Sequence, residues 1–147
     1  LNFHTMKNII LNFLFISLAV LSISAQNFQT DYIRGESSTY CAEENFSFNF
    51  KKNIFTKIDS YDGSKTVAPS KVAQTNYDNN GYYFEVWSPK YILDDYGIDE
   101  YRKYYHYSHK ILYDKRGGNV LYVYEVDMDS KVGKFYFTKK GYELFCR

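Results

Sequence analysis

Apolar and polar residues alternate along most of the chain beyond residue 40. In segment 46–50, Phe46, Phe48 and Phe50 are separated by single polar residues. In a β-strand, every second side chain points to the same face, so the three rings would share one face and the polar residues the other. The segment therefore predicts a half-buried strand.

The same alternation returns in segments separated by turn-forming residues. Clusters of Asn, Asp, Gly and Lys predict turns at 51–53, 59–64, 78–81, 114–119, 127–130 and 139–141. The strongest turn signal is 78–81, because Asn and Gly tolerate the positive φ of tight hairpins. Strands are predicted at 46–50, 54–58, 71–77, 82–87, 104–113, 120–126, 134–138 and 142–146, and one helical turn at 92–102.

Seven or eight strands joined mostly by short turns predict an all-β fold with a single antiparallel meander. A meander of this length forms either a small barrel or a curled open sheet, and only a closed barrel encloses a lumen. The barrel would be lipocalin-like in outline only, because the chain carries no motif specific to that family. Segment 120–126 is apolar on both faces, which is typical of a central strand.

The start of the chain has the pattern of a secretory signal peptide. Lys7 precedes a mostly apolar run over 9–21, and small residues up to Ala25 follow it. The run contains Asn12 and Ser17 and is shorter than the ~20 apolar residues of a spanning helix. The pattern therefore predicts a cleaved leader rather than a membrane anchor.

Cleavage is expected after Ala25, with Ser24 as the alternative, and the residues before Met6 are interpreted as an over-extended start. This divides the chain into a signal peptide, 1–25, and one all-β domain, 26–147. The expected location is secreted or periplasmic, with no membrane span after cleavage. The oligomeric state is left open.

Charge and cysteine content add to this interpretation. Loss of the leader removes one lysine and leaves 17 basic and 17 acidic residues, which does not favour nucleic acid as a partner. Cys41 and Cys146 lie near the two ends of the predicted domain. In an oxidising compartment they are expected to form a disulfide, the alternatives being two free thiols or an intermolecular bridge.

The densest aromatic cluster is 101–110. As a strand it would place Tyr101, Tyr105 and Tyr107 on one face, and Tyr104 and His106 on the other. Tyrosine rings bury area at low entropic cost and are favoured at binding surfaces. The candidate ligand-binding residues are therefore these five and Trp87. The alternative is that the rings only cover a thin core.

No catalytic, metal or cofactor motif is recognised. His106 and His109 would point to opposite faces of a strand, both partly exposed, so they would not share a metal. The acidic stretches 94–100 and 127–129 do not follow the spacing of an EF-hand loop. We expect no cofactor and assign no catalytic residue.

The sequence therefore favours a non-catalytic binding module that uses an aromatic-rich face or cavity to bind a protein or glycan partner. A structural, envelope-associated component is the first alternative. A hydrolase with unidentified carboxylates is the second, because the separation of two carboxylates cannot be obtained from sequence.

Overall fold

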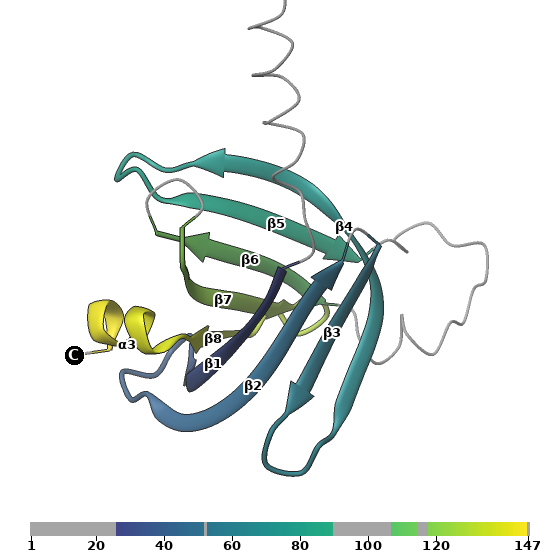
Figure 1. Ribbon diagram of the computed structural model, residues 1–147, viewed down its shortest axis with the longest axis horizontal. Coiled ribbons are helices and arrows are strands. Elements are labelled where there is room, and N and C mark those ends of the chain that lie inside the picture. The colour runs from purple at the N-terminus through teal and green to yellow at the C-terminus, as the bar shows by residue number, and fades with distance from the viewer. Residues whose placement is uncertain (1–25, 52, 90–106, 115–117, 147) are drawn as a thin grey trace, which may run out of the picture.

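The computed structural model describes residues 26–51, 53–89, 107–114 and 118–146 (Figure 1). They form eight antiparallel strands that close into a barrel in the order β1 to β8. The predicted all-β meander is confirmed, and of its two forms the closed barrel is the one observed.

Each strand pairs with the next, and β8 returns to β1 through the pairs Tyr32 with Phe137 and Ile33 with Tyr136. None of the eight strands is therefore left as a free edge. Their bounds are β1 (Gln26–Gly35), β2 (Ala42–Lys51), β3 (Ile54–Asp59), β4 (Lys65–Tyr77), β5 (Tyr83–Pro89), β6 (Tyr107–Tyr113), β7 (Val120–Asp127) and β8 (Gly133–Phe137).

The interior of the barrel is packed with aromatic rings. The three alternating phenylalanines of β2 all point inward, and Phe48 and Phe50 stack with ring centroids 6.1 Å apart. The buried core cluster consists of Phe46, Phe48, Phe50, Phe55, Ala68, Trp87, Ile111, Tyr113, Val123 and Tyr136. Rings that fill the interior at this density contribute most of the apolar burial that stabilises the fold.

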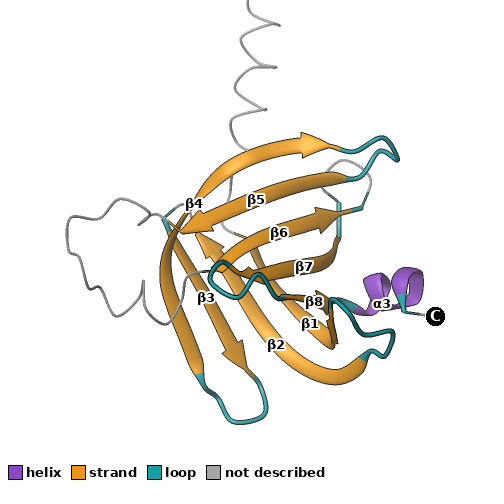
Figure 2. Cartoon of the chain, turned by 180° about the vertical axis from the view of Figure 1, so that it is seen from behind, coloured by secondary structure: helices purple, strands orange, loops and turns teal. Residues whose placement is uncertain are grey.

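The prediction for the C-terminus was wrong. Residues Lys139–Phe145 form helix α3 instead of a turn and a strand. The side chain of Thr138 caps the helix by accepting a hydrogen bond from the amide of Gly141, as Ser and Thr do at helix N-termini. The helix lies outside the barrel beside β8 (Figure 2).

Two further differences concern the extent of strands. β1 precedes the first strand expected from the alternation, and β4 begins at Lys65 rather than at residue 71. The helical turn expected at 92–102 lies outside the described residues. Within the described ranges, no helix has the length and apolarity needed to cross a membrane.

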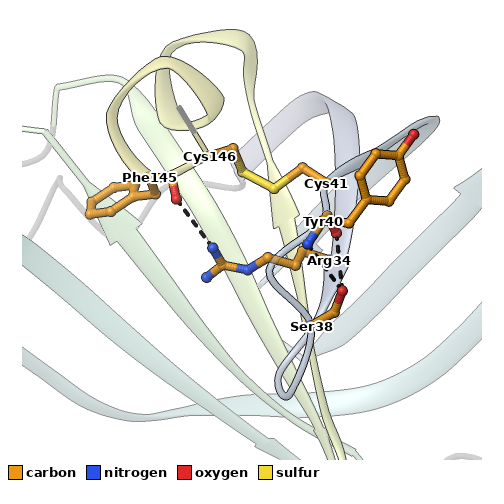
Figure 3. The surroundings of a disulfide bond; sticks show 6 residues. All are labelled: Arg34, Ser38, Tyr40, Cys41, Phe145 and Cys146. Atoms are coloured by element: carbon orange, nitrogen blue, oxygen red, sulfur yellow. Dashed lines mark hydrogen bonds between the residues drawn. A yellow bond between two sulfur atoms is a disulfide. The ribbon is translucent and has the colours of Figure 1, made fainter.

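Cys41 and Cys146 form a disulfide that joins residues 105 positions apart, as predicted (Figure 3). It connects the start of β2 to the end of α3, not to a last strand. A guanidinium nitrogen of Arg34 on β1 also donates to the carbonyl of Phe145 at 3.1 Å. The C-terminal helix is thus held against the barrel by the disulfide and by polar contacts, which include the ion pair of Lys140 with Asp114.

Candidate functional site

The structure places two of the six candidate ligand-binding residues. Trp87 lies in the core with only 2% of its surface exposed, and its ring packs 5.3 Å from that of Phe50. Tyr107, at the start of β6, is half-buried and lines a cavity at one end of the barrel. The other four, Tyr101, Tyr104, Tyr105 and His106, lie outside the described residues.

Beneath that cavity lies a polar centre around the carboxylate of Glu125 on β7. The ammonium of Lys57 on β3 donates to both carboxylate oxygens, at 2.9 and 3.0 Å. The hydroxyl of Tyr136 on β8 donates to Oε1 at 3.0 Å. Nε2 of His109 on β6 lies 2.8 Å from Oε2, and because a carboxylate only accepts, this nitrogen carries the proton.

The four side chains come from four strands and meet because each occupies an inward position. His109 pairs in register with Glu125, while Lys57 reaches across the interior from a strand that is not a neighbour of β7. The ring of Phe55 lies 4.3 Å from the His109 ring and covers it. We call this group, Lys57, His109, Glu125 and Tyr136, the Glu125 centre.

The electrostatics of the Glu125 centre favour an ionised carboxylate. Burial by itself would raise the pKa of Glu125, but the hydrogen bond and charge of His109, together with Lys57, lower this pKa to about 2. Burial and the negative charge of Glu125 raise the pKa of the Tyr136 hydroxyl, which keeps it a neutral donor. The centre is therefore a fixed array of donors around one charged acceptor.

The cavity above the centre has a volume of about 360 Å³. The side chain of Lys57 is 19% exposed and that of Glu125 is 5% exposed. The cavity is lined by Lys57, Tyr107, Glu125, Asp127, Ser130, Val132, Lys134 and Tyr136. It lies within the range of about 300–1,000 Å³ that is usual for small-ligand sites.

A second buried carboxylate, Glu85 on β5, has only 2% of its surface exposed. Its Oε1 accepts from the hydroxyl of Tyr83 at 3.0 Å. Its Oε2 accepts from Nε1 of Trp87 at 3.2 Å and from the hydroxyl of Tyr113 at 3.3 Å. This arrangement explains why Trp87, a candidate ligand-binding residue by sequence, lies in the interior.

Sequence reasoning missed both carboxylates, although a signal for them was present. Glu85 and Glu125 occupy the inward phase of their strands, two residues from the buried Trp87 and Val123, respectively. A charged residue in the buried phase of an alternating strand is rarely left without partners, because isolated buried charge is costly. The expectation that His109 would be partly exposed was wrong, since its side chain is 3% exposed.

Among the described residues, no group of three or more His, Cys, Asp or Glu side chains has a geometry that would hold a metal ion. Asp127, from one of the acidic stretches, accepts from the backbone amides of Asp129 and Ser130 through Oδ1. It thus organises a turn, which is an ordinary role for aspartate. The stretch 94–100 lies outside the described residues.

No protein-family model, curated protein or solved structure matches this chain. The site is therefore interpreted from its own chemistry. Its features are a small cavity at the end of a closed barrel, the side chains of Lys134 and Asp127 on the wall, and a buried carboxylate already paired with Lys57.

Proposed function

We propose that this protein is an exported, non-catalytic binding protein whose ligand is a small organic anion held at the mouth of the barrel. The observation that carries the proposal is the ion pair of Lys57 and Glu125, which crosses an aromatic interior and opens into the 360 Å³ cavity. Closure of the strands supports a small ligand over an extended partner at this site.

A purely structural role accounts poorly for the Glu125 centre. Burying an ion pair costs desolvation energy, and well-packed apolar side chains of similar volume often stabilise a core equally well or better. Ionisable groups with perturbed pKa values that line a cavity are candidates for functional sites. Ligand binding in the cavity would account for the buried charges of Lys57 and Glu125, whereas packing alone does not.

The polar groups of the cavity favour an anionic ligand. The oxygens of Glu125 already accept hydrogen bonds from Lys57, His109 and Tyr136, so this carboxylate has little capacity left for a ligand. Lys57 is paired with Glu125, and Oδ1 of Asp127, which also lines the cavity, accepts from the amides of Asp129 and Ser130. The ammonium of Lys134 is the positive charge that we assign to the ligand. Tyr107 offers a flat ring to an apolar or aromatic portion of the ligand.

The proposal can be tested with the anionic dye anilinonaphthalenesulfonate, which combines a sulfonate with aromatic rings. We expect saturable one-to-one binding that benzoate displaces. Tyr107→Ser and Lys134→Gln should each weaken binding about three- to tenfold, which corresponds to roughly 0.7–1.4 kcal/mol. Lys71→Gln, on the exposed part of β4, is the matched control and should bind like the parent protein. Equal dye affinity in all four proteins would exclude the cavity as the site.

Hydrolysis is supported less well by the same residues. A general acid at neutral pH needs a raised pKa, whereas the pKa of Glu125 is lowered to about 2. Glu85 is enclosed by three donors and is almost fully buried. Neither carboxylate has the environment of an acid catalyst.

A structural role in a larger assembly would call for an exposed apolar sheet face. On β1 and β2, the outward positions instead carry amide and hydroxyl side chains, among them Asn27, Gln29, Ser47 and Asn49. Such a face favours contact with a polar ligand.

A further inference from the structure

The outer surface of β1, β2 and β3 carries a groove of about 620 Å³, separate from the barrel mouth. The three strands lie side by side in this order (Figure 1). Because Phe28 and Phe48 point into the core, the residues that alternate with them point outward. The outward residues that line the groove are Asn27, Gln29, Ser47, Asn49, Lys51, Ile54, Thr56, Ile58 and, from β4, Lys65.

Strand register arranges the polar side chains in rows across the groove. Asn27 pairs with Asn49, which pairs with Thr56. Two residues along the strands, Gln29 pairs with Ser47. Directly opposed residues of neighbouring strands are about 4.5–5.5 Å apart, so the first row is a continuous series of amide and hydroxyl groups. In the second row, Ser47 is followed by Ile58 on β3.

One polar atom in these rows lacks a hydrogen-bond partner in the described part of the chain. The side-chain oxygen of Asn49 is buried and has no hydrogen-bond partner among the described residues. A buried acceptor without a donor destabilises the folded state, so it is rarely retained in a core. Because the side chain of Asn49 lines the groove, a rotation of its amide would present this oxygen to a ligand hydroxyl.

The charged side chains that line the groove are all basic. Its lining includes Lys51 and Lys65 and no acidic side chain, although the domain as a whole carries balanced charge. Ile54, which is 44% exposed, and Ile58 provide apolar contacts beside the polar rows. The groove therefore combines donors, acceptors, positive charge and an apolar strip.

We propose that this groove binds an acidic glycan, a chain of sugar units that bears carboxylates. Neighbouring sugar hydroxyls both donate and accept, as Asn27 and Asn49 require, while the lysines attract the carboxylates. The apolar strip contacts the C–H face of a sugar ring. An extended peptide is favoured less, because peptides commonly add to a free strand edge, and β1, β2 and β3 are each paired on both sides.

The test is calorimetric titration of the full domain with trigalacturonate as the acidic glycan, galactotriose as the neutral glycan and triglutamate as the acidic peptide. We expect trigalacturonate to bind at least tenfold more tightly than either comparison ligand. Its affinity should fall as salt is raised from 50 to 500 mM, because screening weakens the lysine contribution.

Asn49→Ala separates a binding role from a structural one. Since the side-chain oxygen has no partner, its removal should leave thermal stability unchanged or higher, while affinity for trigalacturonate falls about five- to tenfold. Lys51→Gln with Lys65→Gln should abolish the preference for trigalacturonate over galactotriose. The control pair Lys71→Gln with Lys139→Gln removes the same charge from exposed positions outside the groove and should not change it.

Equal binding of triglutamate and trigalacturonate would overturn the glycan assignment in favour of a general polyanion surface. Equal or tighter binding of galactotriose would overturn the role of the lysines, and absence of binding by all three ligands would overturn the site. Tyr107→Ser, in the barrel mouth, should leave trigalacturonate affinity unchanged, so failure of this proposal is distinguishable from failure of the small-anion site.

Discussion

The ammonium of Lys57 contacts both carboxylate oxygens of Glu125 from a strand on another part of the barrel wall, at 2.9 and 3.0 Å. Because β3 and β7 are not neighbours, the ion pair spans the interior rather than running along one sheet surface. It links two sections of the wall that share no backbone hydrogen bonds. Removal of this ion pair should therefore lower the stability of the whole barrel.

Replacing Lys57 by Met leaves the buried Glu125 with the hydrogen bonds of His109 and Tyr136 as its remaining contacts among the described residues. Breaking a buried pair from one side typically costs 3–5 kcal/mol, so we expect a loss of about this size in urea unfolding. Lys51→Met, on the exposed surface of β2, should change stability by less than about 0.5 kcal/mol. The double variant Lys57→Met with Glu125→Met should be more stable than Lys57→Met alone, because no lone carboxylate remains. If the double variant is the less stable of the two, the cost does not arise from an unpaired charge.

The same pair predicts how stability depends on acid. The pKa of Glu125 is lowered to about 2 in the folded state from an ordinary value of 4.5. A lowered pKa stabilises the fold above the ordinary value, and this contribution is lost as the pH falls from about 4.5 to about 2. Urea midpoints measured across this window should decline less steeply in Glu125→Gln than in the parent. Parallel declines would show that other carboxylates cause the acid sensitivity.

Alkaline pH should act through the tyrosines of the Glu85 cluster. Burial and the neighbouring carboxylate of Glu85 raise the pKa of Tyr83 to about 12, and the pKa of Tyr113 is raised for the same reasons. The neutral phenols stabilise the fold fully below pH 10, and Tyr83 loses this contribution as the pH rises towards 12. Absorbance at 295 nm should show exposed tyrosines such as Tyr61 ionising first. In Tyr83→Phe, the component that titrates near pH 12 should shrink by one tyrosine.

The strands of the barrel were predictable because the two faces of a strand differ in polarity. Phe46, Phe48 and Phe50 alternate with polar residues, so period two alone locates β2 and its inward face. The first strand was missed because its inward sequence is less uniform: Phe28 is followed by the buried Thr30, and a register shift follows between Thr30 and Tyr32. A shift of register interrupts the alternation on which the prediction depends.

The C-terminal helix was missed for another reason. Segment 142–146 alternates enough to resemble a strand. The contacts that favour a helix instead are the Thr138 cap and the Cys41–Cys146 disulfide. The candidate site was predictable only in part. Tyr107 was found by its aromatic neighbours, whereas Lys57 and Glu125 meet through barrel closure, which sequence patterns do not determine.

The disulfide should contribute strongly to stability. Closing a loop of this length restricts the unfolded chain by about 4–5 kcal/mol in the chain-entropy model. We expect Cys41→Ser with Cys146→Ser to lower the free energy of unfolding by about this amount in urea titrations. Reduction of the parent protein should reproduce the loss, and dithiothreitol should not affect the double variant. An unchanged midpoint after complete reduction, verified by thiol titration, would contradict the prediction.

Gly141 lies where α3 packs directly against the backbone of β7. A Cβ added there would clash with the carbonyl oxygen of Leu121 on β7, and a backbone oxygen cannot move aside as a side chain does. Gly141→Ala should therefore displace α3, despite the better helix propensity of alanine, and destabilise the domain by about 2–3 kcal/mol. Gly35→Ala, whose Cβ would meet only the Ser38 Cβ at 3.9 Å, is the control and should cost less than about 1 kcal/mol. Because the displaced helix carries Cys146, the disulfide of Gly141→Ala should also react faster with dithiothreitol, which thiol release over time will measure. Equal stability of the two variants would mean that α3 adjusts without leaving the barrel.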